Sequence, residues 1–191
     1  MAGRNGTESI EAFRSMRNRA ISCLSLSQFS GRSPLAPGQV HQFRFRPMSA
    51  IKVGANYSFS AIVNFSVEPA GLSARRWEIR HAGYGYRLAD DREREILAFQ
   101  WDPDGIGEGT VRTPHVHVGH GRVGVIRPKD PNDLVGDVLS RLVRAHVPTG
   151  AVGFAAVLRM LVDDFEAPVR RPDWDIVLTE CAQQEQAIVF R

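Results

Sequence analysis

The feature that most constrains this chain is a run of alternating apolar and polar residues between positions 57 and 67. One set of alternate positions reads Tyr, Phe, Ala, Val, Phe, Val, and the intervening set reads Ser, Ser, Ile, Asn, Ser. Because successive side chains of a β-strand point to opposite faces of a sheet, this pattern predicts a strand with one apolar and one polar face. The chain is therefore expected to build a sheet that buries only one of its faces.

Neighbouring segments carry further strand signals, separated by turn residues. The predicted strands cover residues 40–46, 57–67, 76–88, 95–101 and 115–118, with residues 123–126 as a candidate continuation. Gly83 and Gly85 predict a bulge or bend, and Asp90 and Asp91 are typical of a hairpin tip. Residues 40–126 are therefore predicted to form an antiparallel β-meander of about five strands.

The segment before the meander has helical spacing. Residues 8–28 place apolar side chains on one face and arginines between them, which predicts an amphipathic helix with a basic solvent side. The apolar residues are Ile10, Phe13, Ala20, Ile21 and Leu24, and the arginines are Arg14, Arg17 and Arg19.

Three more helices are predicted within residues 130–190. The first has Asp130 as its N-cap and Pro131 at its first position, and it stops at Pro148. The second is capped by Thr149 and runs through Phe165, and the third is capped by Asp173. The order of elements predicts an α+β fold, with an N-terminal helix and three C-terminal helices packed on one face of the meander.

The length of 191 residues favours a single domain over residues 1–191. The longest nearly apolar run, residues 151–158, is far shorter than the roughly 20 residues that span a bilayer, so no membrane association is expected. The two cysteines, Cys23 and Cys181, are typical of buried reduced thiols. A cytoplasmic location is the expectation that follows.

The charge is unevenly distributed along the chain. Residues 1–89 carry 11 Arg and one Lys against four acidic residues, a net charge of +8, whereas residues 90–191 have a net charge of −5. Arginine supplies 22 of the 24 basic residues. Such usage suits phosphate recognition through bidentate guanidinium contacts, although GC-rich coding produces the same bias.

Three of the six histidines lie within eight residues, at positions 115, 117 and 120. In a strand, His115 and His117 project from one face, while Val116 and Val118 are expected to face the core. The pair could act in general acid–base chemistry, with His120 beyond Gly119, or could chelate a divalent metal. Equally, two surface histidines at a strand end could have no chemical role.

A metal would need at least one more ligand than this pair. The loop before His115 offers Asp102, Asp104 and Glu108. We take Asp102 as the candidate third ligand, and a divalent metal as the candidate cofactor.

Two known histidine motifs match only in part. Gly109, His115 and His117 have the spacing that opens the cupin metal motif, but the glutamate that should follow is absent. Histidine-triad nucleotide hydrolases and transferases alternate three histidines with apolar residues, and here Gly119 occupies the third histidine position while His120 is one residue late. A degenerate histidine-triad-like enzyme is kept as a remoter alternative.

Four short stretches together resemble the TumE-like group of small proteins from bacterial toxin–antitoxin loci. They are residues 80–86, 96–102, 113–118 and 133–139, within a resemblance that covers roughly residues 57–180. The resemblance implies a toxin that acts on nucleic acids or translation and is neutralised by a cognate antitoxin protein.

Two functions remain open from the sequence. The first is a toxin-like enzyme acting on RNA or nucleotides, with His115, His117 and His120 as catalytic residues. In that case the phosphate would be held by Arg80, Arg87 and Arg112. The alternative is a non-enzymatic interaction protein, such as an antitoxin or scaffold, whose acidic second half meets a basic partner.

Overall fold

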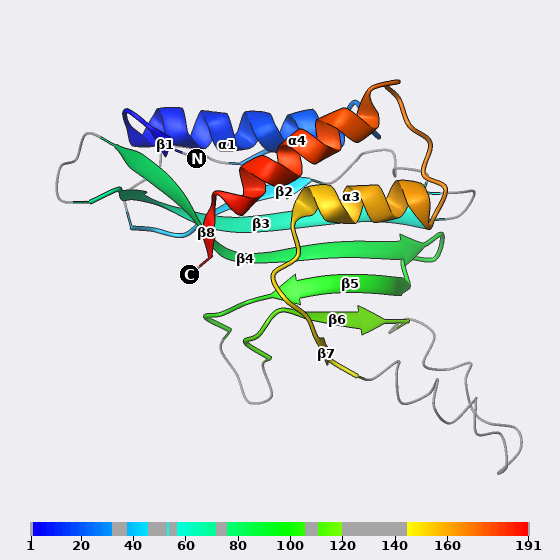
Figure 1. Cartoon of the computed structure of the whole chain (residues 1–191). Coiled ribbons are helices and arrows are strands. Elements are labelled where there is room, and N and C mark those ends of the chain that lie inside the picture. The colour runs from blue at the N-terminus through cyan, green and yellow to red at the C-terminus, as the bar shows by residue number, and fades with distance from the viewer. Residues whose placement is uncertain are drawn as a thin grey trace, which may run out of the picture.

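One mainly antiparallel sheet runs through the described part of the chain (Figure 1). This computed structural model describes residues 2–31, 38–45, 53, 57–71, 76–105, 111–119 and 145–190. The main strands follow the order β2-β3-β4-β5-β6-β7, and every neighbouring pair is antiparallel. They are β2 (His41–Phe45), β3 (Tyr57–Pro69), β4 (Trp77–Asp90), β5 (Glu95–Trp101), β6 (His115–Val118) and β7 (Val147–Pro148). The predicted meander is therefore confirmed.

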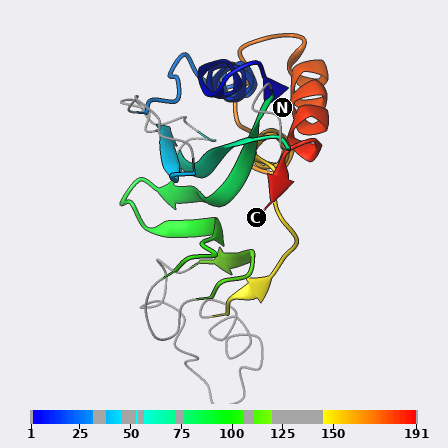
Figure 2. The same ribbon diagram turned by 90° about the vertical axis from the view of Figure 1, so that its left-hand side faces the viewer.

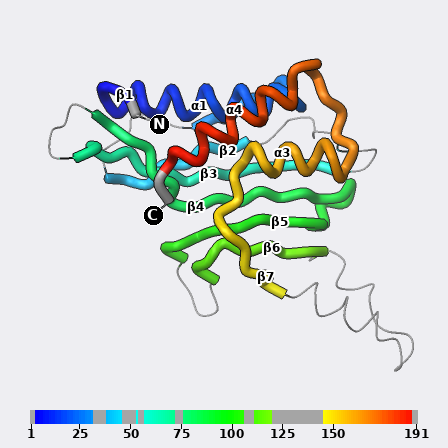
Figure 3. Tube along the Cα trace, viewed as in Figure 1, coloured from blue at the N-terminus to red at the C-terminus, as the bar shows by residue number. Residues whose placement is uncertain are grey.

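Two short strands at the chain ends complete the sheet. The strand β1 (Ala2–Gly3) pairs antiparallel with the start of β4, and β8 (Val189–Phe190) pairs parallel with it a few residues further on. Both ends of the described chain thus meet at one strand (Figure 3). This pairing could not be predicted from the sequence, because two-residue strands carry no readable periodicity.

Three described helices lie on one face of the sheet, over β2, β3 and β4 (Figures 1 and 2). They are α1 (Gly6–Ile21), α3 (Phe154–Asp163) and α4 (Trp174–Gln186). The α+β class and the one-sided packing of the helices are as predicted. Most of the first predicted C-terminal helix, and residues 123–126, lie outside the described residues.

The alternation in β3 divides the sheet into two faces. Phe59, Ala61, Val63, Phe65 and Val67 are buried in the core, where the Phe65 ring lies 5.2 Å from Phe13 of α1. The intervening residues of this strand point to the opposite face, which we call the groove face. It carries Ser58, Ser60, Ile62 and Asn64 of β3.

The helix boundaries differ from the predictions at two points. The first helix ends at Ile21 instead of residue 28, and a serine-rich stretch follows in which the backbone N–H of Ser27 bonds to the hydroxyl of Ser25. Serine side chains compete in this way with helical hydrogen bonds. Helix α3 begins at Phe154, not directly after Thr149, because the N–H of Thr149 bonds to the Pro114 carbonyl and extends the sheet.

The prediction that Arg17 faces solvent is wrong. Its side chain is only 1% exposed and forms an ion pair with Glu185 near the end of α4. One guanidinium nitrogen lies 3.0 Å from Nε2 of His81 on β4, and the group lies over the Phe13 ring. Helical spacing places Arg17 beside the apolar face. The ion pair with Glu185 compensates for the cost of removing the guanidinium charge from water.

Glu185 also caps the neighbouring helix α3. Its carboxylate accepts hydrogen bonds of 3.2 Å from the backbone N–H groups of Phe154 and Ala155, at a helix start whose N-cap, Gly153, provides no side-chain acceptor. A Cβ atom at Gly153 would collide with this carboxylate. A negative charge at a helix N-terminus is favourable, so a single carboxylate holds α1, α3 and α4 together.

The described residues contain no helix that is long and apolar enough to cross a membrane. Cys23 and Cys181 are free and buried, as expected. Burial is the main cause that raises the pKa of both thiols, to about 11 for Cys181.

We predict that Glu185→Ala destabilises the protein by about 3–5 kcal/mol, because it leaves the Arg17 charge buried without its counterion. The matched control is Glu180→Ala, which removes an exposed ion pair between the same two helices, with Arg19. That change should cost no more than about 1 kcal/mol. Urea unfolding measures both, and equal effects would contradict the role assigned to Glu185.

A second prediction concerns pH. Burial, and then the charge of Arg17, lower the pKa of His81 well below 6.5. The unfolded chain therefore binds a proton near pH 6.5 that the folded chain does not bind. The stability associated with neutral His81 is fully present above this pH and falls below it, by up to about 1.4 kcal/mol per pH unit.

The control for this pH effect is His81→Gln, which keeps a hydrogen-bond acceptor for Arg17 but does not titrate. The free energy of unfolding of both proteins should be measured from pH 7.5 to pH 5. Parallel pH curves would show that His81 does not cause the loss of stability.

Candidate functional site

The two histidines of β6 lie on the groove face of the sheet. His115 pairs with Gln100 of β5, which pairs with Gly85 of β4, which in turn pairs with Ile62 of β3. The rings of His115 and His117 lie side by side, with centroids 4.9 Å apart. Val118, expected in the core, is 44% exposed at the end of its strand.

A third histidine, His146, joins this pair from the opposite side. Strand β7 pairs with β6 so that Val147 lies opposite Val116, and the same register places His146 opposite His117. The ring centroid of His146 is 4.4 Å from that of His117 and 5.0 Å from that of His115. One ring nitrogen from each of the three imidazoles lies within 4.8 Å of the other two.

Sequence reasoning missed His146, because the segment before Pro148 was interpreted as the end of a helix. One signal for the correct structure was available. A residue that precedes proline is biased towards extended backbone, and Val147 is such a residue. Even so, nothing in the local sequence connects position 146 with positions 115 and 117.

A hydrogen bond fixes the orientation of the His115 ring. Its Nδ1 lies 2.8 Å from the backbone carbonyl of Thr113, so Nδ1 carries the proton and donates it. The lone pair of neutral His115 is then on Nε2. Histidines that bind metals commonly have this arrangement, because the outer hydrogen bond selects the tautomer that leaves the other nitrogen free to coordinate.

The spacing of the three imidazoles is close to what a metal requires. In a tetrahedral zinc site with Zn–N bonds of about 2.0–2.1 Å, two nitrogen ligands lie about 3.3 Å apart. The ring nitrogens lie within 4.8 Å of one another, so they would have to approach by up to about 1.5 Å to share one zinc ion. We call His115, His117 and His146 the three-histidine cluster; in the described ranges it is the one group of at least three ligand side chains so close together.

The other predicted acidic and histidine residues have different positions. Asp102 is exposed and lines the same pocket as His115 and His146, but it is not part of the three-histidine cluster. Asp104 is also exposed, at the turn after β5. Glu108 and His120 lie outside the described residues, so their roles stay predictions.

Two of the three predicted phosphate-binding arginines are engaged by acidic groups. Arg80 forms ion pairs of 3.2 Å with Glu68 and 2.9 Å with Glu78. Arg87 lies 3.5 Å from Glu95 and donates a hydrogen bond to the backbone carbonyl of Glu93. Arg112, three residues before His115, is exposed and has no ion pair within the described residues.

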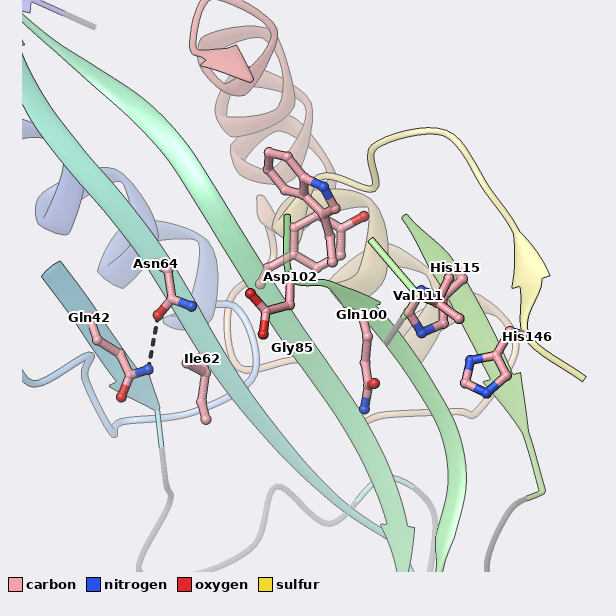
Figure 4. Close-up of a pocket in the computed structure, with 11 residues that line it drawn as sticks. Gln42, Ile62, Asn64, Gly85, Gln100, Asp102, Val111, His115 and His146 are labelled. Carbon is pink, nitrogen blue, oxygen red and sulfur yellow. Dashed lines mark hydrogen bonds between the residues drawn. The ribbon is translucent and has the colours of Figure 1, made fainter. Parts of the chain in front are cut away.

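A pocket of about 420 Å³ lies on the groove face beside the cluster (Figure 4). Its polar lining includes Gln42, Asn64 and Gln100, together with Asp102, His115 and His146. The side-chain amide of Gln42 donates a 2.9 Å hydrogen bond to Oδ1 of Asn64. A second hollow, of about 680 Å³, shares Ile62, Gly85 and Gln100 with this pocket, so the groove continues towards Arg87.

Two glycines of β4 have opposite roles beside this pocket. Gly83 has a φ of +134°, and a Cβ there would lie 2.8 Å from the backbone oxygen of Trp101. Gly85 lies at the base of the pocket, where an added Cβ would meet no atom within 4 Å. Gly83 is thus required by backbone geometry, whereas Gly85 leaves space that a ligand could occupy.

We predict that Gly83→Ala destabilises the protein by about 1–3 kcal/mol, because alanine is strained at this φ. Gly85→Ala, two residues away on the same strand, should change the stability by no more than about 0.5 kcal/mol. Chemical denaturation of both variants measures the difference. Similar losses of stability in the two variants would contradict the conclusion that the space above Gly85 is open.

In comparisons with protein-family models, with curated proteins and with solved structures, no match to this chain was found. The resemblance to the TumE-like group thus remains a prediction from the sequence, and the functional argument depends on the three-histidine cluster and its pocket.

Proposed function

We propose that this protein is a metal-dependent hydrolase, with Zn²⁺ or a similar divalent ion held by the three-histidine cluster. The observation that carries the proposal is the convergence of His115 and His117 of β6 with His146, directly before β7, at the edge of a pocket. Three protein ligands leave a fourth coordination position for water, which is the arrangement of catalytic rather than structural zinc sites.

The chemistry follows from the charge of the ion. A bound divalent metal lowers the pKa of its water ligand to about 7, so that hydroxide is available near neutral pH. In a phosphoester, the hydroxide oxygen would form a bond to phosphorus while the bond from phosphorus to the leaving oxygen breaks. The leaving oxygen then takes up a proton, so that one water molecule is consumed for each bond cleaved.

The substrate class proposed is RNA or a nucleotide. The sequence resemblance to the TumE-like group and the basic first half of the chain support this choice. Exposed Arg112 is the best placed of the three arginines to contact a phosphate, since Arg80 and Arg87 are already paired with acidic groups. In a cell, such an activity would act as a toxin that a cognate partner neutralises.

The first test is metal binding by the purified full-length chain. After chelation and dialysis, titration with Zn²⁺ should show one site per chain, and Co²⁺ should give the visible absorption of a tetrahedral site. His115→Ala, His117→Ala and His146→Ala should each weaken binding by about 100-fold or more, while His41→Gln, a histidine on β2, should not. A wild-type protein that binds no zinc would refute the proposal.

The second test is activity. The zinc-loaded protein should cleave RNA or nucleotide phosphoesters, and its expression should inhibit growth. His146→Ala should abolish both effects, because it removes a metal ligand but leaves the Pro-His-x-His strand intact. Unchanged cleavage by folded His146→Ala would contradict the metal-dependent reaction and favour acid–base catalysis by His115 and His117 alone. Zinc binding without any cleavage or toxicity would contradict the hydrolase and favour the alternative of a non-enzymatic interaction protein.

A further inference from the structure

We infer that the pocket beside the three-histidine cluster binds a nucleobase, and that it selects a substrate of nucleoside or nucleotide size. This inference deepens the proposed function, because it assigns the part of the substrate that does not react. It depends on how the pocket is lined, how large it is and how the neighbouring arginines on the same face are already paired.

The floor of the pocket offers no free backbone groups for recognition. Ile62, Gly85, Gln100 and His115 form a row across four neighbouring strands, and the backbone groups of these strands are used in pairing with one another. A ligand on this face cannot add itself as another strand. Recognition must therefore come from the side chains that stand above the sheet.

Those side chains have the hydrogen-bonding character of nucleobase edges. Gln42, Asn64 and Gln100 each present a carboxamide, and Asp102 adds a carboxylate that accepts from N–H groups. The Gln42–Asn64 hydrogen bond holds two of the amides in place, whereas the Gln100 amide makes no side-chain hydrogen bond within the described residues. Amide side chains pair with the donor and acceptor edges of bases.

The charge of the pocket favours a neutral group over additional phosphates. On this face Arg44 donates a hydrogen bond from Nε to the side-chain Oε1 of Gln42, and Arg87 pairs with Glu95. Asp102 is the acidic residue in the lining, and it would repel a phosphate. The anionic part of a nucleotide is better placed at the metal, and its base in the amide-lined part of the pocket.

The dimensions agree with one nucleotide. A volume of about 420 Å³ is near the lower end of the range for small-molecule sites, which is about 300–1,000 Å³. Gly85 is two strands away from His115, a separation of about 10 Å. The space above Gly85 can therefore accept a base while the phosphoester lies beside the histidines.

Nucleoside binding to the zinc-loaded full-length protein tests this inference. Isothermal titration with adenosine, guanosine, cytidine and uridine should detect at least one of them, and inorganic pyrophosphate should not displace it. Gly85→Leu fills the pocket and should abolish nucleoside binding, and Gln100→Leu, of similar size, should weaken it about tenfold. The control Ser60→Leu adds the same side chain on the same face but outside this pocket and should bind normally.

The same samples separate this inference from the proposed function. Zinc titration of Gly85→Leu and Gln100→Leu should match the wild type, and circular dichroism confirms that they are folded. Absence of nucleoside binding by zinc-loaded wild type, or normal binding by Gly85→Leu, would overturn the nucleobase pocket and leave the metal centre intact. Nucleoside binding by a wild-type protein that takes up no zinc would support the pocket and refute the hydrolase.

Discussion

The buried ion pair between Arg17 and Glu185 is the interaction on which the helical side of this protein depends. It joins the first described helix to the last, and the same carboxylate caps α3 while the guanidinium contacts His81 of the sheet. A buried pair contributes little net stability compared with well-packed apolar residues, but loss of one partner is costly. The pair therefore connects α1 and α4 with the N-terminus of α3 and with β4, and breaking it would leave a buried charge unpaired.

This arrangement leaves the second face of the sheet available for chemistry. All three described helices lie on the apolar face (Figure 2), so no described helix covers the groove face, where the pocket has amides, Gly85 and exposed His146 in its lining, with His115 buried at its edge. Two glycines of β4 contribute differently. Gly83 lies beside the irregularity in the β3–β4 pairing and allows close approach of the Trp101 backbone, whereas Gly85 leaves the groove unfilled. Stability and the proposed function thus reside on opposite sides of one layer.

The features of the fold and site that could be predicted from the sequence are those that follow from local periodicity. Alternation between residues 57 and 67 identified β3 and its buried face, and the His115–His117 spacing placed two imidazoles together. The parts that it missed depend on distant partners. Arg17 has the same helical spacing whether it faces solvent or Glu185, and the β7 segment became recognisable only through its pairing with β6.

The sequence by itself determined the α+β class, the order of the five principal strands and the side of the sheet on which His115 and His117 lie, since each follows from side-chain spacing over a few residues. Only the tertiary structure decided that His146 completes their cluster, that Arg80 and Arg87 are paired with acidic residues and that Glu185 caps α3. These contacts join residues far apart along the chain, and their energies depend on burial and geometry that exist only after folding.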